Sequence, residues 1–264
     1  MSFATRDGTR LRAWLFVPAQ APGRPAGGPS SRLATVVALH GCSGVAGPHA
    51  PPGTTFSPRH LAMAEMLLGE GYAVLFPDSL GPRGTGSICS QKIGVRAVNQ
   101  AQRRLDALAA LSWVAAQPWA DPHRIAVLGW SHGANTVLAV TNTKRPEVNA
   151  VPDRFAAAIA FYPWCRAAVQ TGYRPNTHLA IMIGALDDWT PAQPCVSLGR
   201  ITQSEVHVFG GTYHDFDNLA GRLRHIPNIP NGVDPAQGVH AGPNPDARDE
   251  AYSRVRRLLA TALR

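Results

Sequence analysis

The sequence contains no apolar run that is long enough to cross a bilayer. A membrane-spanning helix needs roughly 20 consecutive apolar residues, and charged residues, glycine or proline interrupt every apolar run here much earlier. The first eight residues, Met1 to Gly8, also lack the apolar segment of a secretory signal peptide. We therefore expect no membrane partner and no signal peptide within this chain.

Charged residues and metal-binding patterns are scarce as well. Only 16% of the 264 residues are charged, and the four cysteines have no C-x-x-C spacing. Structural zinc sites normally show ligand pairs at such short spacings. The sequence therefore indicates no metal site.

The residues that are present favour a folded α/β protein. Hydrophobic residues make up 45% of the chain, which together with its length predicts one domain over 1–264. The net charge of +8 is compatible with nucleic acid, an acidic surface or an anionic substrate. However, the arginines are scattered, and the dense group at 254–257 follows Asp246, Asp249 and Glu250. This pattern favours an ordinary basic surface and no nucleic-acid partner.

Short apolar runs alternate with amphipathic segments along the chain. The runs 3–5 and 11–17 predict an antiparallel hairpin at one edge of a sheet. The further predicted strands are 34–39, 72–76, 124–128, 155–161, 179–183 and 205–209. The predicted helices are 59–68, 95–116, 134–140, 191–199 and 247–263, the last with Asp246 as its cap. Strands alternating with helices indicate a doubly wound, mainly parallel sheet flanked by helices.

Three further segments carry weaker expectations. In the helix 95–116 we expect Arg103, Arg104 and Asp106 to lie off the apolar face. The stretch 18–32 is rich in proline and glycine and predicts a loop. The stretch 215–246 predicts a polar insertion.

The pentapeptide 129–133 reads Gly-Trp-Ser-His-Gly and lies between a predicted strand and a predicted helix. A serine in this setting is typical of the nucleophile elbow of α/β-hydrolases. The flanking glycines remove side chains that would collide in so tight a turn, and the following helix dipole favours developing negative charge. The alternative is a chance match in a surface loop, which the strand-turn-helix setting disfavours.

A nucleophilic serine needs a base, and the base needs a carboxylate that orients it. In α/β-hydrolases the chain order is serine, acid, histidine. Asp187 and Asp188 follow the predicted strand 179–183, and His214 follows the last predicted strand. We therefore predict Ser131, one of these aspartates and His214 as catalytic residues. Three other histidines lie within a strand or in the insertion and fit less well: His207, His225 and His240.

An acyl-transfer site also needs two backbone N–H groups that bind the developing oxyanion. One is expected from His132, the residue after the nucleophile. The other is expected from Cys42, in the glycine-rich turn that follows the strand 34–39. The alternative for Cys42 is an ordinary glycine-rich turn.

These motifs together resemble the dienelactone hydrolase family of α/β-hydrolases. The matching segments are HGCSG (40–44), PDSLGPRG (77–84), GWSHG (129–133), GALDDWTP (184–191) and HDF (214–216). In that family the acid lies three residues after the glycine of the fourth segment, which selects Asp187 over Asp188. The resemblance implies a small-molecule ester substrate and no cofactor. Dienelactone hydrolases use a cysteine nucleophile, so Ser131 favours a serine esterase that forms an acyl-enzyme.

Three alternatives to an esterase remain open. A serine peptidase of the same fold would use the same triad, although such enzymes often carry a propeller or lid domain for which this chain has no room. An acyltransferase would differ only in the group that resolves the acyl-enzyme. A non-catalytic binding protein on this scaffold would be expected to lack a triad member, and none is missing here.

Aromatic and basic residues beside the predicted site are candidates for substrate binding. Trp130, Trp164 and Trp189, with Tyr162, could form an aromatic pocket, or they could be core or lid packing. Arg83 could bind a substrate carboxylate with its planar guanidinium, or form a structural salt bridge.

In the sheet order of the resembling family, the four cysteines can pair across the carboxyl edge of the sheet. We expect disulfides Cys42–Cys89 and Cys165–Cys195, which would brace the oxyanion loop and the segment that holds Asp187. Disulfides persist in oxidising compartments, so this pairing would imply a periplasmic or secreted enzyme. Four reduced cysteines would instead fit a cytoplasmic enzyme.

Overall fold

The chain is organised around an eight-stranded sheet with the order β1-β2-β4-β3-β5-β6-β7-β8. The first three strands in this order pair antiparallel, and all the following neighbours pair parallel. The strands are β1 Ser2–Ala4, β2 Arg10–Phe16, β3 Leu33–Leu39, β4 Ala73–Asp78, β5 Ala120–Trp130, β6 Ala157–Phe161, β7 His178–Gly184 and β8 Glu205–Phe209. The predicted hairpin and the mainly parallel sheet are therefore confirmed.

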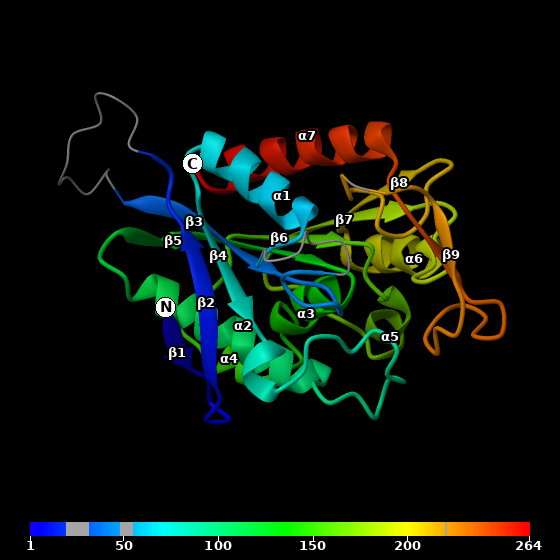
Figure 1. Cartoon of the computed structure of the whole chain (residues 1–264). Helices are drawn as coiled ribbons and strands as arrows, with labels where there is room; N and C mark the ends of the chain where they lie inside the picture. Colours follow the sequence, from blue (N-terminus) through cyan, green and yellow to red (C-terminus); the bar gives the residue numbers. More distant parts are fainter. Residues whose placement is uncertain (20–31, 48–54, 220) are drawn as a thin grey trace.

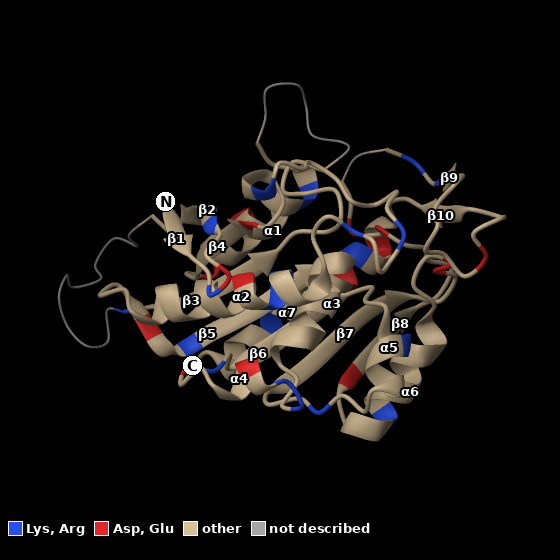
Figure 2. Cartoon of the chain, turned by 90° about the horizontal axis from the view of Figure 1, so that it is seen from below, with Lys and Arg blue, Asp and Glu red and all other residues tan. Residues whose placement is uncertain are grey.

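The computed structural model describes residues 1–19, 32–47, 55–219 and 221–264. Most of the predicted loop 18–32 therefore lies outside the described residues. Within them, Lys and Arg occur on several elements, interspersed with Asp and Glu (Figure 2).

Helices cover both faces of the sheet. The helices are α1 Pro58–Gly69, the 3-10 turn η2 Gly81–Arg83, α2 Gln100–Ala115, α3 His132–Val140, α4 Pro146–Asn149, α5 Cys165–Gln170, α6 Ala192–Thr202 and α7 Pro245–Ala262. Helices α1 and α7 lie on one face, and α2 and α3 lie on the opposite face (Figure 1). Because the central strands are covered on both sides, β4 and β6 are buried at every position.

Two helices begin at asparagine residues that the sequence analysis did not select. Asn99 caps α2 by accepting a hydrogen bond from Gln102 N (3.0 Å), and the Gln102 side chain accepts one from Asn99 N (2.9 Å). Asn244 caps α7 by accepting from Ala247 N at 3.2 Å. The predicted start of α2 at residue 95 and the predicted cap Asp246 are therefore wrong, because the side chains of Asn99 and Asn244 satisfy the free N–H groups instead.

The charged residues of α2 are buried, contrary to expectation. Arg103 is 1% exposed, Arg104 is 7% exposed and Asp106 is 1% exposed. Each has a polar partner from another segment: His40 O, Glu147 and Arg83, respectively. The helix packs against α3 as well as the sheet, so its charged side also faces protein.

The stretch 215–246 contains a second, two-stranded sheet of β9 Arg224–Ile226 and β10 Val239–Ala241. A bridge between His214 and Ala241 and a hydrogen bond from Gly242 N to His214 O tie it to the residue before it, and a hydrogen bond from Asn244 N to Phe216 O joins its own two ends, both hydrogen bonds 2.9 Å. The predicted insertion thus folds back beside the carboxyl edge of the main sheet.

Candidate active site

Ser131 lies at the turn between β5 and α3 in a strained conformation, with φ 52° and ψ −112°. Ser131 N donates to Phe161 O, and Asn135 N donates to Ser131 O, both at 2.9 Å. A Cβ on Gly129 would collide with the backbone of Gly133, and one on Gly133 would collide with Leu39 O. Only glycine therefore fits on either side of this turn, as the pentapeptide indicated.

Asp187 and His214 form a buried pair at the ends of neighbouring strands. Asp187 Oδ2 lies 2.8 Å from His214 Nδ1, and the two side chains are 0% and 3% exposed. The other carboxylate oxygen, Oδ1, accepts from Trp189 N (2.9 Å) and Thr190 N (2.7 Å). Because a carboxylate only accepts, a hydrogen bond between the two places a proton on His214 Nδ1, and Nε2 is the ring nitrogen that remains available to take up another.

The hydroxyl group of Thr190 contacts both members of this pair. It lies 2.9 Å from Asp187 Oδ2 and 3.1 Å from His214 Nδ1, and it also reaches Tyr162 O at 3.0 Å. The sequence analysis did not select Thr190, since a threonine after an acidic turn is an ordinary helix-entry residue.

Asp188 faces a different histidine. Its Oδ2 lies 2.7 Å from His240 Nδ1, and its Oδ1 accepts from His240 N at 2.7 Å. Asp188 O also accepts from Val233 N at 2.9 Å. Asp188 therefore holds the segment that carries β10, whereas Asp187 faces His214.

Ser131 and His214 line one cavity of about 420 Å³, here called the main cavity, together with Cys42, Cys89, Arg59 and Trp189. Among the described residues, no hydrogen bond joins Ser131 Oγ to His214. In the absence of substrate such contacts are often long. A shared cavity brings both side chains within reach of one ligand.

The two expected oxyanion residues also lie beside Ser131. Cys42 lines the main cavity, and Cys42 and His132 line a narrow space of about 20 Å³, here called the neck, to which Ser131 also contributes. A Cβ on Gly41 would lie 3.9 Å from Ser131 Cβ, an ordinary van der Waals distance, so the loop runs directly past the serine. The two segments are thus adjacent at the serine.

A buried arginine connects these two segments. Arg103 Nη1 donates to His40 O at 2.8 Å and lies 3.3 Å from His132 Nδ1. Since arginine only donates, His132 Nδ1 accepts and its ring is neutral. Burial and the nearby Arg103 charge hold the pKa of His132 well below its usual value. Burial lowers the pKa of Arg103 to about 10, with the charges of Arg83 and Arg96 acting in the same direction and those of Asp106 and Asp78 opposing it. The sequence offered no signal for this residue beyond a charge on a helix.

Arg83 is not available to a substrate, so its predicted binding role is wrong. Its two terminal nitrogens donate to the two oxygens of Asp106, both at 2.8 Å, and they also reach Asp7 and Ser79 O. This planar, two-bond pairing uses the guanidinium to join α2 to the loop after β4. The structural alternative therefore holds.

Trp130 and Tyr162 are core residues, so a pocket role for Trp130 is also wrong. Both are 0% exposed. Trp130 Nε1 and Tyr162 Oη each donate to Asp217 at 2.6 Å. Arg59 donates to Tyr162 Oη and forms ion pairs with Asp215 and Asp217. Burial opposes ionisation of Asp215, but the adjacent Arg59 charge outweighs it and lowers the Asp215 pKa to about 2.

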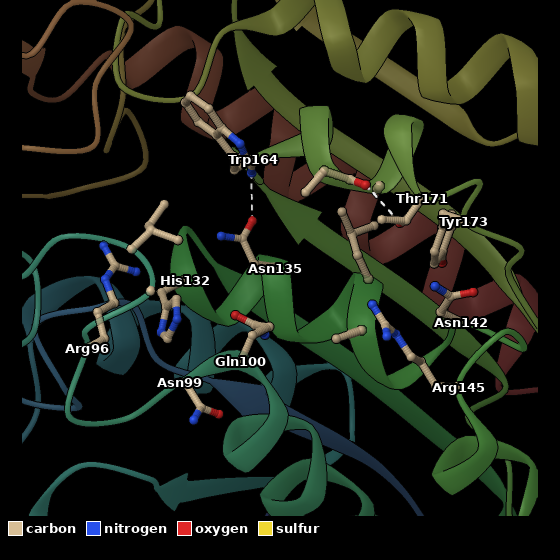
Figure 3. A pocket seen from close by; sticks show the side chains of 16 residues that line it. Arg96, Asn99, Gln100, His132, Asn135, Asn142, Arg145, Trp164, Thr171 and Tyr173 are labelled. Atoms are coloured by element: carbon tan, nitrogen blue, oxygen red, sulfur yellow. Dashed lines mark hydrogen bonds between the residues drawn. The ribbon is translucent and has the colours of Figure 1, made fainter.

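Trp164 and Trp189 do lie at cavity walls. Trp189 lines the main cavity and the neck, with its ring centroid 4.8 Å from that of His214. Trp164 lines the neck and a further space of about 230 Å³ between α3 and α5, here called the side cavity. Figure 3 shows Trp164 beside Asn135, joined by a hydrogen bond from Trp164 N to Asn135 Oδ1 of 2.6 Å.

The four cysteines form two disulfides, Cys42–Cys89 and Cys165–Cys195, as expected. The first joins the loop after β3 to the loop after β4, and Ile88 N donates to Cys42 O at 2.9 Å beside it. The second joins the start of α5 to α6, which follows Asp187. Both therefore brace walls of the cavities around Ser131.

Over the described part of the chain, no cluster of His, Cys, Asp and Glu side chains has the arrangement of a metal site. None of the helices there is both long and apolar enough to cross a membrane.

The chain is similar in sequence to known hydrolases. The sequence model of the X-Pro dipeptidyl-peptidase (S15) family matches residues 7–167. Acylamino-acid-releasing enzyme 2 of Oryza sativa subsp. japonica is 29% identical over 178 residues, which cover 67% of this chain. The chain spans only 19% of the length of that rice enzyme.

Solved structures show the same fold. Thermogutta terrifontis esterase 2, phosphorylated by paraoxon, aligns with a TM-score of 0.64 at 18% identity over 99% of this chain and 93% of its own. A dienelactone hydrolase-like promiscuous phosphotriesterase from metagenomic libraries aligns at 0.64 and 19% identity over 100% and 98%. Porphyromonas gingivalis dipeptidyl peptidase 4 aligns at 0.61 and 18% identity over 100% of this chain and 35% of its own. The expected α/β-hydrolase fold and the resemblance to dienelactone hydrolases are confirmed.

Proposed function

We propose that this chain, which belongs to the X-Pro dipeptidyl-peptidase (S15) family and has the α/β-hydrolase fold, is a serine hydrolase that cleaves carboxylic esters. The observation that carries this proposal is the buried Asp187–His214 pair beside the strained Ser131. His214 and Ser131 line the same cavity. We propose a small-molecule substrate and a single domain over 1–264. One buried apolar cluster that extends from Phe3 to Leu263 supports the single domain.

In the proposed reaction, His214 Nε2 takes the proton from Ser131 Oγ while Oγ attacks the ester carbonyl carbon. Asp187 keeps the His214 proton on Nδ1 and stabilises the imidazolium that forms. His214 then protonates the leaving alcohol. Water, deprotonated by His214, hydrolyses the acyl-enzyme and releases the acid.

The oxyanion would accept hydrogen bonds from Cys42 N and His132 N. Helix α3 begins at His132, so its dipole adds to the stabilisation of negative charge there. Arg103 would act as a positioning residue because it holds the segments of both donors. The disulfide Cys42–Cys89 would restrain the first donor in the same way.

A peptidase is the second candidate, since the family description and the rice relative both favour it. An enzyme that removes dipeptides from a free amino terminus must bind an ammonium group. Among the described residues that line the three cavities, Asp215 is the one carboxylate, and Arg59 already pairs with it. This arrangement favours an ester over a peptide with a free amino terminus.

The test compares p-nitrophenyl acetate and butyrate with alanyl-prolyl p-nitroanilide, using the wild-type protein and Ser131→Ala. We expect turnover of the esters, little release of p-nitroaniline and a loss of about 10⁴-fold or more in kcat for Ser131→Ala. A fluorophosphonate should add once, at Ser131. Faster cleavage of the anilide would favour the peptidase, and ester turnover that survives Ser131→Ala would contradict the proposed nucleophile. No turnover of either substrate class would favour a binding protein.

We also propose that the enzyme works in an oxidising compartment, either periplasmic or secreted. Two disulfides at the candidate site support this location, because such bonds are rare in reducing compartments. Mass spectrometry of the unreduced native protein tests it: four alkylatable thiols would contradict the proposal.

A further inference from the structure

The cavities around Ser131 form two separate arms. The neck shares Cys42, Ser131 and Trp189 with the main cavity. It also shares Arg96, His132, Asn135 and Trp164 with the side cavity. A ligand at Ser131 can therefore extend in two directions, into the main cavity or through the neck into the side cavity.

The position of His214 distinguishes the two arms. His214 lines the main cavity and is not among the residues that line the neck or the side cavity. In the proposed reaction His214 must reach the leaving-group oxygen to protonate it. The leaving alcohol therefore belongs in the main cavity, and the acyl group belongs in the neck and the side cavity.

The acyl arm combines apolar walls with positive charge. Leu138, Ala139, Ala167 and Ala168 line the side cavity. Its described lining residues, like those of the neck, include no Asp or Glu, whereas two arginines are present. Figure 3 shows these arginines at opposite ends of the cavity, Arg96 beside His132 and Arg145 near Asn142 and Tyr173.

Arg96 is the better placed of the two for binding. Its Nε donates to Gln91 O at 3.1 Å, which orients the guanidinium, and no ion pair with a described carboxylate is formed. Partial burial lowers its pKa, the sign of a cation that lacks a counter-charge. Arg145 is exposed, so solvent weakens any ion pair that it makes.

We propose that the side cavity is the acyl-binding site and that Arg96 pairs there with a second carboxylate on the acyl group, so that the substrates are monoesters of dicarboxylic acids. This inference rests on the proposed esterase function. The neck, with a volume of about 20 Å³, is lined by Trp164 and Trp189. A chain of methylenes would pass between them, and the guanidinium would then bind the distal carboxylate through charge-assisted hydrogen bonds. The disulfide Cys165–Cys195 would hold α5, one wall of this site, in place.

A kinetic test compares p-nitrophenyl monoesters of succinic, glutaric and adipic acid with the corresponding methyl-capped diesters. For at least one chain length we expect kcat/KM to favour the free acid by roughly 10- to 100-fold, the effect of a hydrogen-bonded charge pair. Arg96→Met should bring this ratio close to one, and Arg96→Lys should restore part of it. Arg257→Met, an exposed position on α7, removes the same charge and should leave the ratio unchanged. A ratio that is unchanged in Arg96→Met, or a wild-type preference for the capped esters, would overturn the proposal.

A binding test separates this inference from the esterase function. Calorimetry of Ser131→Ala with glutarate or adipate, against pentanoate or hexanoate, should show at least about tenfold tighter binding of the diacid. Arg96→Met in the same background should abolish that preference. If the diacid preference appears but no ester is hydrolysed, the esterase proposal fails and the binding site stands. Equal binding of both acids, or no binding of either, would overturn the site.

Discussion

Arg103 Nη1 lies 3.3 Å from His132 Nδ1 and, through its 2.8 Å bond to His40 O, joins the segments that carry both expected oxyanion donors. The guanidinium is almost completely buried, and its Nε and Nη2 have no hydrogen-bond partner among the described residues. Such an arrangement lowers the stability of the fold, because the hydrogen bonds of the buried cation replace only part of the hydration that it loses. We propose that Arg103 instead serves to hold the two expected oxyanion donors in position.

We therefore expect Arg103→Met to lower kcat by roughly 10- to 100-fold with little change in KM, since small displacements of catalytic groups have effects of this size. Arg104→Met is the matched control. It removes a buried arginine from the next position of α2, where the partner is Glu147 and not the oxyanion segments. Steady-state kinetics on a p-nitrophenyl ester give the answer. Equal losses of kcat in the two variants, at equal thermal stability, would make Arg103 a merely structural residue.

The two neighbouring aspartates should differ sharply. Asp187→Asn should lower kcat by about 10⁴-fold, because an amide at this position favours the wrong tautomer of the base. Asp188→Asn keeps the shape of its side chain but weakens the pair with His240, so we expect a loss below about tenfold. Crystal structures or circular dichroism should show both variants folded. The opposite ranking would mean that His240 and not His214 is the base.

Three buried histidines should make the protein sensitive to mild acid. Burial holds the pKa values of His40, His60 and His132 well below their usual value, and nearby arginine charges lower them further. In the unfolded chain these groups bind protons below about pH 6.5. The unfolded state then holds more protons than the folded state, so the free energy of unfolding falls as the pH decreases from 7 towards 5. The slope should approach about 1.4 kcal/mol per pH unit for each histidine.

Urea denaturation at pH 7.0, 6.0 and 5.0 measures this dependence. His60→Gln removes one buried titrating group and should make the slope smaller, whereas His123→Gln at an exposed position should not. Burial raises the pKa of Asp217, so protonation of this group favours the folded state at lower pH, and the series therefore stops at pH 5.0. Stability that is independent of pH in this range would contradict the prediction.

The two disulfides should differ in their effect on activity. Each closes a long loop, of 47 and 30 residues, so removing either should lower the free energy of unfolding by about 2–4 kcal/mol. Replacing Cys42 and Cys89 by alanine should also lower kcat, since the bond holds the loop of one oxyanion donor. Replacing Cys165 and Cys195 should mainly raise KM, because it frees a wall of the side cavity. Thermal unfolding and kinetics of the two double variants, below their transitions, test both statements.

Several parts of the site were accessible from the sequence because they depend on local geometry. A serine between glycines at a strand-to-helix junction requires the conformation found at Ser131, whatever packs around it. The expected acid and base were selected by the rule that residues after parallel strands meet at one edge of the sheet. Asp187 and His214 follow β7 and β8, which are neighbours, so their contact follows from the strand order.

The partners and the burial of the other charged and aromatic side chains were decided by the tertiary structure. Arg83 and Arg96 lie in the same long loop region, yet one is paired with Asp106 and the other faces a cavity. Trp130 is turned into the core, while Trp164 and Trp189 form cavity walls. A side chain's type and its place in the chain do not specify which partner it meets. That depends on how α2, α3 and α5 pack across the sheet, because burial, and with it the strength of every charge interaction, is a property of the assembled layers.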